Sequence, residues 1–164
     1  MALIKLNNQS LTAVSALPAM DGSNLTGISA GKVLQVVQTT GSTETQASGT
    51  SWTTTDAAIT ITPTSASSKI LVIHSAGGLA RNTANAGLRI RRGSTVIYES
   101  SRFGYHDGSS AYAPINWAVN YLDTPSTTSA TTYDTQIRAG VSVSGNLRHS
   151  DSATWTMIAI EIAG

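Results

Sequence analysis

Apolar and polar residues alternate along much of the chain from Val33 onward. Residues 58–62 alternate and stop at Pro63, and residues 87–91 alternate again before a turn signal at residues 92–94. A period of two places every second side chain on the same face of a β-strand. Each of these runs therefore predicts a strand with one buried face and one solvent face.

About eight such runs recur between turn residues, and no helical period persists beyond two turns. Residues 69–74 differ from the others because they are almost continuously apolar, as expected for a strand that is buried on both faces. Short strands at regular spacing predict an all-β fold, an antiparallel β-sandwich or jelly roll. The expected strands cover residues 33–38, 58–62, 69–74, 87–91, 95–99, 115–122, 132–139 and 154–162, with a short piece at 141–144.

The last expected strand, residues 154–162, is apolar and ends almost at the chain terminus. An unpaired strand of this kind at the edge of a sheet would be an aggregation hazard. We therefore expect it in the middle of a sheet, at a subunit interface, or both. The candidates for an interface are Trp155, Met157, Ile158 and Ile160.

Residues 1–31 follow neither the strand period nor the helix period for long. Their apolar residues are spaced too widely to be buried against one another, so we expect an extended segment that docks on a neighbouring subunit or another partner. A frayed terminus is the alternative. The predicted organisation is thus a docking segment, 1–31, followed by a sandwich domain, 32–164. The residues expected to make the docking contacts are Leu11, Leu17, Leu25 and Ile28.

The charge content argues against nucleic acid as a partner. Only 12% of the residues are charged and the net charge is +1, whereas a nucleic-acid binder needs clustered cations to neutralise phosphates. The one local cluster, Arg89, Arg91 and Arg92, fits solvent-facing strand and turn positions. The N-terminus lacks the apolar core of a signal peptide, and no stretch reaches the length of a membrane helix, so we expect a soluble chain made in a cytosol and not inserted in a membrane.

A search for catalytic or metal-binding motifs leaves no candidate. The chain has no cysteine, and its three histidines, His74, His106 and His149, are not at metal-ligand spacing. Ser109, His106 and Asp107 are neighbours in sequence, but a catalytic triad draws its members from separate elements. We therefore predict a protein that is not an enzyme and that uses no cofactor or metal.

One polar loop, residues 101–112, concentrates aromatic rings among Ser and Gly. Aromatic rings supply contact area at low entropic cost, and small polar residues supply adaptable hydrogen bonds, a mixture typical of binding loops. Aromatic faces also stack on sugars, so a host-surface glycan is the expected ligand class. The alternative is an ordinary loop whose rings cap the core. The candidate receptor-binding residues are Phe103, Tyr105, His106, Asp107 and Tyr112.

Residues 17–28, Leu-Pro-Ala-Met-Asp-Gly-Ser-Asn-Leu-Thr-Gly-Ile, resemble a linker that recurs in bacteriophage tail-fibre proteins. Residues 31–38 look like the beginning of the C-terminal domain of such fibres, especially those of marine and cyanobacterial phages. The similarity continues through residues 60–72, 91–98 and 153–161. As a combination these segments are moderately specific, although each one alone has residue types common in β-proteins.

The resemblance implies a trimeric, jelly-roll-like head domain, with residues 1–31 attaching it to other virion proteins. It implies a virion location after assembly in the host cytoplasm, and trimer formation would cover the apolar last strand. The stretch before the domain is much shorter than a typical fibre shaft, which leaves a short fibre, a tip or adaptor subunit, and a capsid-decorating cement or head-fibre protein as alternatives. The His-x-His metal pairs of some fibres are absent, so no metal site carries over. A soluble carbohydrate-binding module is the alternative from a different class.

Overall fold

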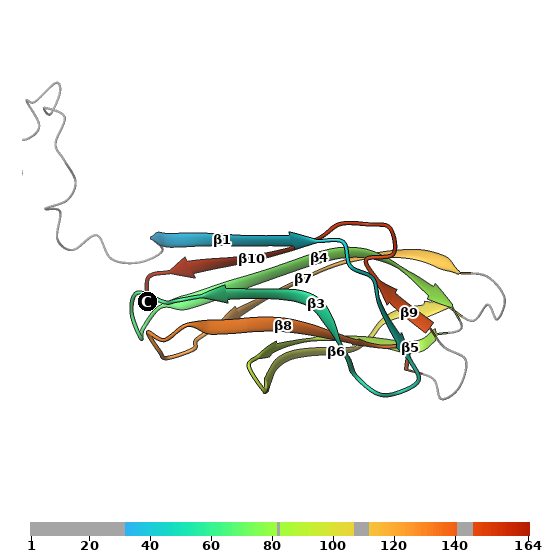
Figure 1. Ribbon diagram of the computed structural model, residues 1–164. Helices are drawn as coiled ribbons and strands as arrows, with labels where there is room; N and C mark the ends of the chain where they lie inside the picture. Colours follow the sequence, from blue (N-terminus) through green and yellow to red (C-terminus); the bar gives the residue numbers. More distant parts are fainter. Residues whose placement is uncertain (1–31, 82, 107–111, 141–145) are drawn as a thin grey trace, which may run out of the picture.

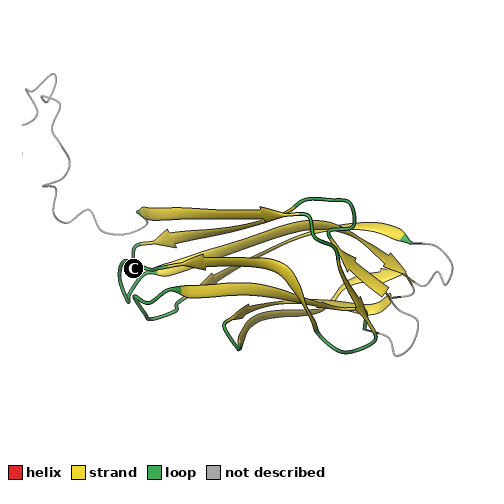
Figure 2. Ribbon diagram, viewed as in Figure 1, coloured by secondary structure: helices red, strands yellow, loops and turns green. Residues whose placement is uncertain are grey.

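The structure is a computed structural model that describes residues 32–81, 83–106, 112–140 and 146–164; residues 83–85 and 104–106 are described by their backbone alone. All regular secondary structure in these ranges is β-strand (Figure 2). The strands form two antiparallel sheets packed face to face, which confirms the predicted all-β sandwich.

The two sheets form the upper and lower layers in Figure 1. In the large sheet, four long strands lie side by side in the order β1 (Val33–Gly41), β10 (Trp155–Ile162), β4 (Lys69–Arg81) and β7 (Ala113–Asp123). The short strands β9 (Asn146–His149) and β2 (Thr45–Ser48) extend the same sheet beside the second half of β4. The small sheet has the order β3 (Thr53–Ile61), β8 (Thr131–Arg138), β5 (Thr83–Arg92) and β6 (Thr95–His106).

Successive long strands alternate between the two sheets, apart from the β5–β6 hairpin. This order is typical of a jelly roll. The hairpin turns at Gly93, whose φ of +57° lies in the left-handed region that glycine adopts without steric cost. The predicted turn at residues 92–94 is therefore confirmed.

The long strands form where the sequence alternates, and the alternation decides which side chains enter the core. Along β10, buried and half-buried residues alternate without a break from Trp155 to Ile162. The interior contains two hydrophobic clusters, one of which includes Ile70, Val72 and Met157. The second lies around Leu88, Ile137 and Leu147.

The structure has more strand than the sequence predicts. The strand expected at residues 69–74 continues to Arg81 through Ser, Ala and Gly residues that carry little hydrophobic signal. Hydrogen-bonded pairing with β7 and β9, and not hydrophobic burial, holds the second half of this strand. Gly78 lies so close to the carbonyl oxygen of Arg148 that a Cβ at this position would collide with it. β2 and β9 were not expected, and the piece expected at residues 141–144 lies outside the described residues.

The expectation that residues 69–74 are buried on both faces is wrong for the single chain. Ile70, Val72 and His74 are buried between the sheets, while Leu71 and Ile73 point to the outer face and are only half-buried. The reason is that no element within the described residues covers that outer face.

Candidate interaction surface

The outer face of the large sheet carries a row of apolar side chains across its four long strands. The strand register places Val36 of β1 opposite Ile160 of β10, Ile160 opposite Leu71 of β4, and Leu71 opposite Leu122 of β7. The ends of this row are the most open, with Val36 59% exposed and Leu122 48% exposed. We call these four residues the apolar row.

A second row runs beside the first and contains no charge. It places Gln38 opposite Ile158, Ile158 opposite Ile73, and Ile73 opposite Asn120. Six apolar residues therefore adjoin one another on one solvent-facing sheet surface. Large exposed apolar patches are frequent at interaction sites, which makes this face the candidate surface.

Two of the four predicted interface residues lie inside the subunit. Trp155 is 3% exposed and Met157 is fully buried, both in the core between the sheets. The indole Nε1 of Trp155 donates a hydrogen bond to Asp56 Oδ2 at 3.0 Å. These two residues cannot contact another subunit from this position, so the predicted interface now rests on Ile158 and Ile160, which lie on the outer face.

The outer face of the small sheet has the opposite chemistry. Arg91 donates two hydrogen bonds of 2.8 Å to the carboxylate of Asp134 on the neighbouring strand. Arg89 donates to Gln136 at 2.6 Å and lies 3.8 Å from Glu99. The side chains of Arg89, Arg91, Glu99 and Asp134 on this face therefore have polar partners within the chain.

Phe103 is one of the predicted receptor-binding residues that the structure places. It is half-buried on β6, and its ring centroid lies 5.4 Å from that of Trp117 on β7. The two rings line a cavity of about 60 Å³ between the two sheets. This volume is well below the roughly 150 Å³ of a cavity that binds benzene. The other lining residues are Leu88, Tyr98, Ser100, Ala118 and Val119.

Tyr112, the second predicted residue with a described side chain, lies beneath two guanidinium groups. Arg81 and Arg148 lie 4.9 and 4.6 Å from its ring centroid, and Arg148 also donates to its hydroxyl oxygen at 3.3 Å. Part of the ring surface that could stack on a sugar is thus used within the chain.

The remaining predicted site residues are not described well enough to place their side chains. Tyr105 and His106 belong to β6 by their backbone, whereas Asp107 lies outside the described residues. The predicted docking residues also lie outside the described residues; they are Leu11, Leu17, Leu25 and Ile28.

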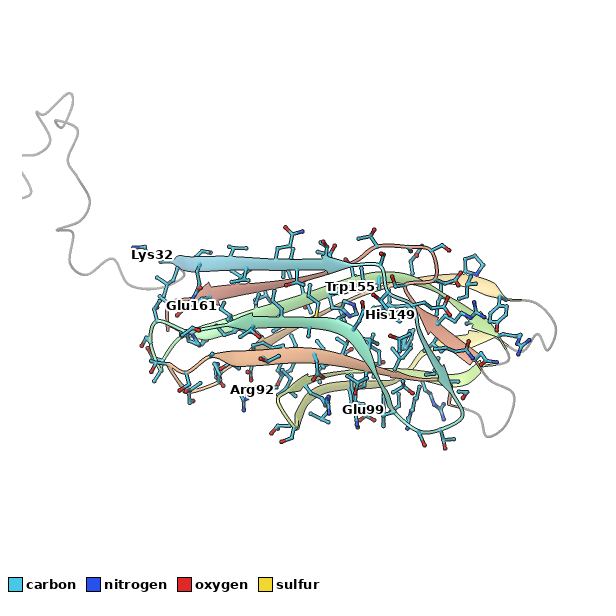
Figure 3. The ribbon with its side chains drawn as sticks, in the orientation of Figure 1. Lys32, Arg92, Glu99, His149, Trp155 and Glu161 are labelled. Atoms are coloured by element: carbon cyan, nitrogen blue, oxygen red, sulfur yellow. The ribbon has the colours of Figure 1, made fainter. Side chains whose placement is uncertain are left out.

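Two histidines far apart in sequence meet in the core. His74 and His149 are both fully buried, and their Nε2 atoms lie 3.2 Å apart. His149 Nδ1 lies 3.6 Å from Asp56 Oδ1, and the His149 ring lies beside Trp155 (Figure 3). Burial lowers the pKa of His74 to about 3, aided by His149, and burial also lowers the pKa of His149 to about 4 despite the opposing charge of Asp56. Both rings are therefore neutral near pH 7.

A buried carboxylate lies at the other end of β10 (labelled in Figure 3). Glu161 is fully buried and accepts hydrogen bonds from Gln35 Nε2 at 2.6 Å and from the Thr64 amide at 2.7 Å. Burial by itself raises the pKa of Glu161, but the hydrogen bonds from Ser68, Gln35 and Thr64 outweigh it and bring the pKa to about 2. The carboxylate is thus a structural acceptor that ties β1 and the β3–β4 loop to β10.

The described residues contain no group of three or more His, Cys, Asp or Glu side chains suited to a metal ion. They also contain no helix that is long and apolar enough to cross a membrane. A scan against protein-family models and a search of curated proteins found no match to this chain.

Sequence reasoning missed Val36, Leu71 and Leu122 as surface residues. The alternation in residues 115–122 could have revealed Leu122, because it shares a face with two asparagines. The position of Leu71 had no such signal, since residues 70–73 are apolar at every position.

Proposed function

We propose that this protein is a structural virion component, a short trimeric fibre or fibre-like appendage that contacts the host surface. The observation that carries the proposal is the apolar row with its neighbours Ile158 and Ile73. A face of this composition is stabilised when another copy covers it, by at most roughly 1.5–3 kcal/mol for each large aliphatic side chain and by less for those already half-buried.

The position of the face also supports this proposal. β1 begins at Val33, opposite Ile162, at the end of the sheet that carries the apolar row. Residues 1–31 join the domain at this end, so assembly through the face would bring the joining points of several copies together. Three equivalent copies around one axis form a closed ring in which each covers the patch of its neighbour. The resemblance of residues 17–28 to fibre linkers supports the virion assignment.

The oligomeric state tests the assembly half of the proposal. Native mass spectrometry and sedimentation equilibrium of the full chain should give about 51 kDa for three 17.0-kDa chains, or a whole multiple of that mass where trimers associate further. A monomer at micromolar concentration would contradict it.

The location of the protein on the phage particle tests the proposed virion role. Immunogold labelling of purified virions with an antibody against residues 32–164 should decorate the particle. Label on tails supports a fibre or adaptor, label on heads supports a capsid-decorating protein, and the absence of label on intact and mildly disrupted virions would contradict a virion role.

For the contact with a host glycan, we propose the surface beside Phe103 and Trp117. The cavity there accepts a small apolar substituent and not a whole sugar ring, so a ring would rest on the surface outside it. A glycan array with the full chain and with the Phe103→Ala variant tests this. Equal glycan binding by both proteins would remove Phe103 from the site.

A further inference from the structure

β7 is an edge strand, and the part of the chain that the structure describes leaves its free side uncovered. It pairs with β4 through eleven consecutive residue pairs without a bulge, and no strand of the described chain pairs with its other side. From Ala113 to Leu122 it carries no charged side chain. Proteins ordinarily protect exposed edges with charges, prolines, bulges or a covering segment, because free N–H and C=O groups there can pair with another chain. Of these devices β7 has a proline, Pro114, near its first residue, and the run from Ile115 to Leu122 has neither charge nor proline.

The other long edges are protected, among them β3, which carries Asp56 and has a register shift against β8. β6, at the edge of the small sheet, carries Glu99 and Arg102 and has three register shifts against β5. β1, at the opposite edge of the large sheet, has a bulge, and its Gln35 side chain donates a 2.7 Å hydrogen bond to Thr62 O next to β3. β7 therefore differs from these edges in its unbroken, uncharged run from Ile115 to Leu122.

The sequence of β7 is nearly palindromic in chemical type around Ala118. Residues 114–122 read Pro-Ile-Asn-Trp-Ala-Val-Asn-Tyr-Leu. In an antiparallel pair of two such strands centred on Ala118, each Asn116 would face Asn120 of the second copy. Trp117 would face Val119, and the outer positions would match aliphatic with aromatic or apolar residues. Amide–amide and aromatic–β-branched pairs are among those that stabilise neighbouring strands.

We propose that two copies of this chain pair along β7, antiparallel, around a two-fold axis at Ala118. The pairing extends the large sheet of one copy directly into that of the other. The absence of charge means that no like charges meet across the axis, and the unbroken register presents a regular row of backbone groups. The β7 pairing uses the strand edge, whereas the trimer proposed above uses the outer face. It is therefore a second contact, beyond the proposed trimer. Where both contacts form, trimers join in pairs.

A single cysteine tests the register, because the natural chain has no cysteine. Directly opposite residues of antiparallel strands have Cα atoms roughly 4.5–5.5 Å apart, within the roughly 4.4–6.8 Å that a disulfide spans. The Ala118→Cys variant of the full chain should therefore form a covalent dimer under mild oxidation, seen on non-reducing gels. Ala118 is exposed on the outer face, so the substitution leaves the core intact.

Asn116→Cys is the matched control, two residues away on the same exposed face. In the proposed register the two introduced thiols lie about four residues apart along the strand, roughly 13 Å, which is too far for a disulfide. A mixture of Asn116→Cys and Asn120→Cys chains should cross-link where neither does alone. Equal cross-linking by Ala118→Cys and Asn116→Cys chains, or none by Ala118→Cys, would overturn the proposal.

A charge exchange gives a second test that does not depend on disulfide geometry. Asn116→Lys with Asn120→Asp places opposite charges across the axis twice, whereas Asn116→Lys with Asn120→Lys places like charges there. Native mass spectrometry should show even-numbered assemblies for the first variant and at least a tenfold loss of them for the second. If both variants assemble equally, the register is wrong.

The same spectra separate this proposal from the trimer. Hexamers support both contacts, and dimers that the Ala118→Cys chain cross-links support the β7 pairing while contradicting the trimer. Trimers without hexamers support the face contact and overturn the β7 pairing, and monomers overturn both.

Discussion

The two outward faces of the sandwich differ in how they satisfy their own side chains. On the small sheet, Arg91 and Asp134 pair through two 2.8 Å hydrogen bonds. On the large sheet, the apolar row ends in Val36 and Leu122, about half of whose surfaces contact solvent. The paired side chains of the polar face have their partners within one chain, whereas the apolar face gains stability only when another surface covers it. The difference supports the proposal that assembly uses the large sheet while solvent meets the small one.

The largest effect is expected from charges placed on the apolar face. Val36→Asp combined with Leu122→Asp should weaken subunit association at least about 100-fold, because two large apolar contacts are lost and two carboxylates resist burial. Sedimentation equilibrium measures this. Both positions are exposed, so the far-UV spectrum should stay unchanged.

Thr60→Asp is the matched control on the small sheet, where Thr60 is exposed and hydrogen-bonded to Thr132 at 2.8 Å. It should leave the oligomeric state unchanged. If it dissociates the protein as strongly as the double variant, the two faces do not differ in the way described.

The two faces exist only in the folded subunit. The buried pair His74 and His149 makes the stability of that subunit fall at acidic pH. The folded-state pKa values of about 3 for His74 and about 4 for His149 lie below the ordinary value of 6.5. As the pH falls below 6.5, the unfolded chain binds protons that the folded chain does not, so the stabilisation present above pH 6.5 is lost progressively. Between pH 7 and pH 5 we expect a loss on the order of 3 kcal/mol in the free energy of unfolding.

Urea unfolding at several pH values measures this loss. The carboxylate of Glu161 adds a separate loss only below about pH 4.5, since its folded-state pKa is about 2. An unfolding free energy that does not change between pH 7 and pH 5 would show that the two histidines are not buried as neutral rings.

A smaller effect is expected from the polar link between the two sheets. Asp123 at the end of β7 accepts hydrogen bonds of 2.9 and 2.8 Å from Arg92 and one of 2.8 Å from the Tyr133 hydroxyl. Asp123→Ala removes the acceptor for both donors and should lower the free energy of unfolding by about 2–3 kcal/mol.

Tyr133→Phe is the companion change, because it removes one donor and leaves Arg92 paired, at a cost of about 1 kcal/mol. Neither variant should alter the number of subunits, since Asp123 and Tyr133 are buried. Dissociation without a change in unfolding free energy would place this link at an interface and contradict the assignment.

The smallest effect is expected from the ion pairs of the small sheet. A double-mutant cycle with Arg91→Met and Asp134→Asn should give a coupling of less than about 1 kcal/mol that decreases in high salt. Thermal unfolding of the four proteins measures it. A salt-independent coupling of several kcal/mol would mean that this face is covered and not open to solvent.

The last strand shows what the hydrophobic pattern alone could predict and what it could not. Its burial in a sheet followed from the apolar content of residues 154–162, and the structure places β10 between β1 and β4. Which face points inward did not follow, because Trp155 and Met157 on one side and Ile158 and Ile160 on the other are equally apolar. A period of two identifies an inner face only where the other face is polar.

The sequence by itself determined that this chain is an all-β sandwich, because alternation and turn residues act locally. The tertiary structure alone decided the pairing of His74 with His149, 75 residues apart, and the alignment of Val36, Ile160, Leu71 and Leu122 from four strands. It also decided that β7 lies at a free edge. These features depend on the order and register of strands that are distant in sequence, which the local pattern of any single strand does not encode.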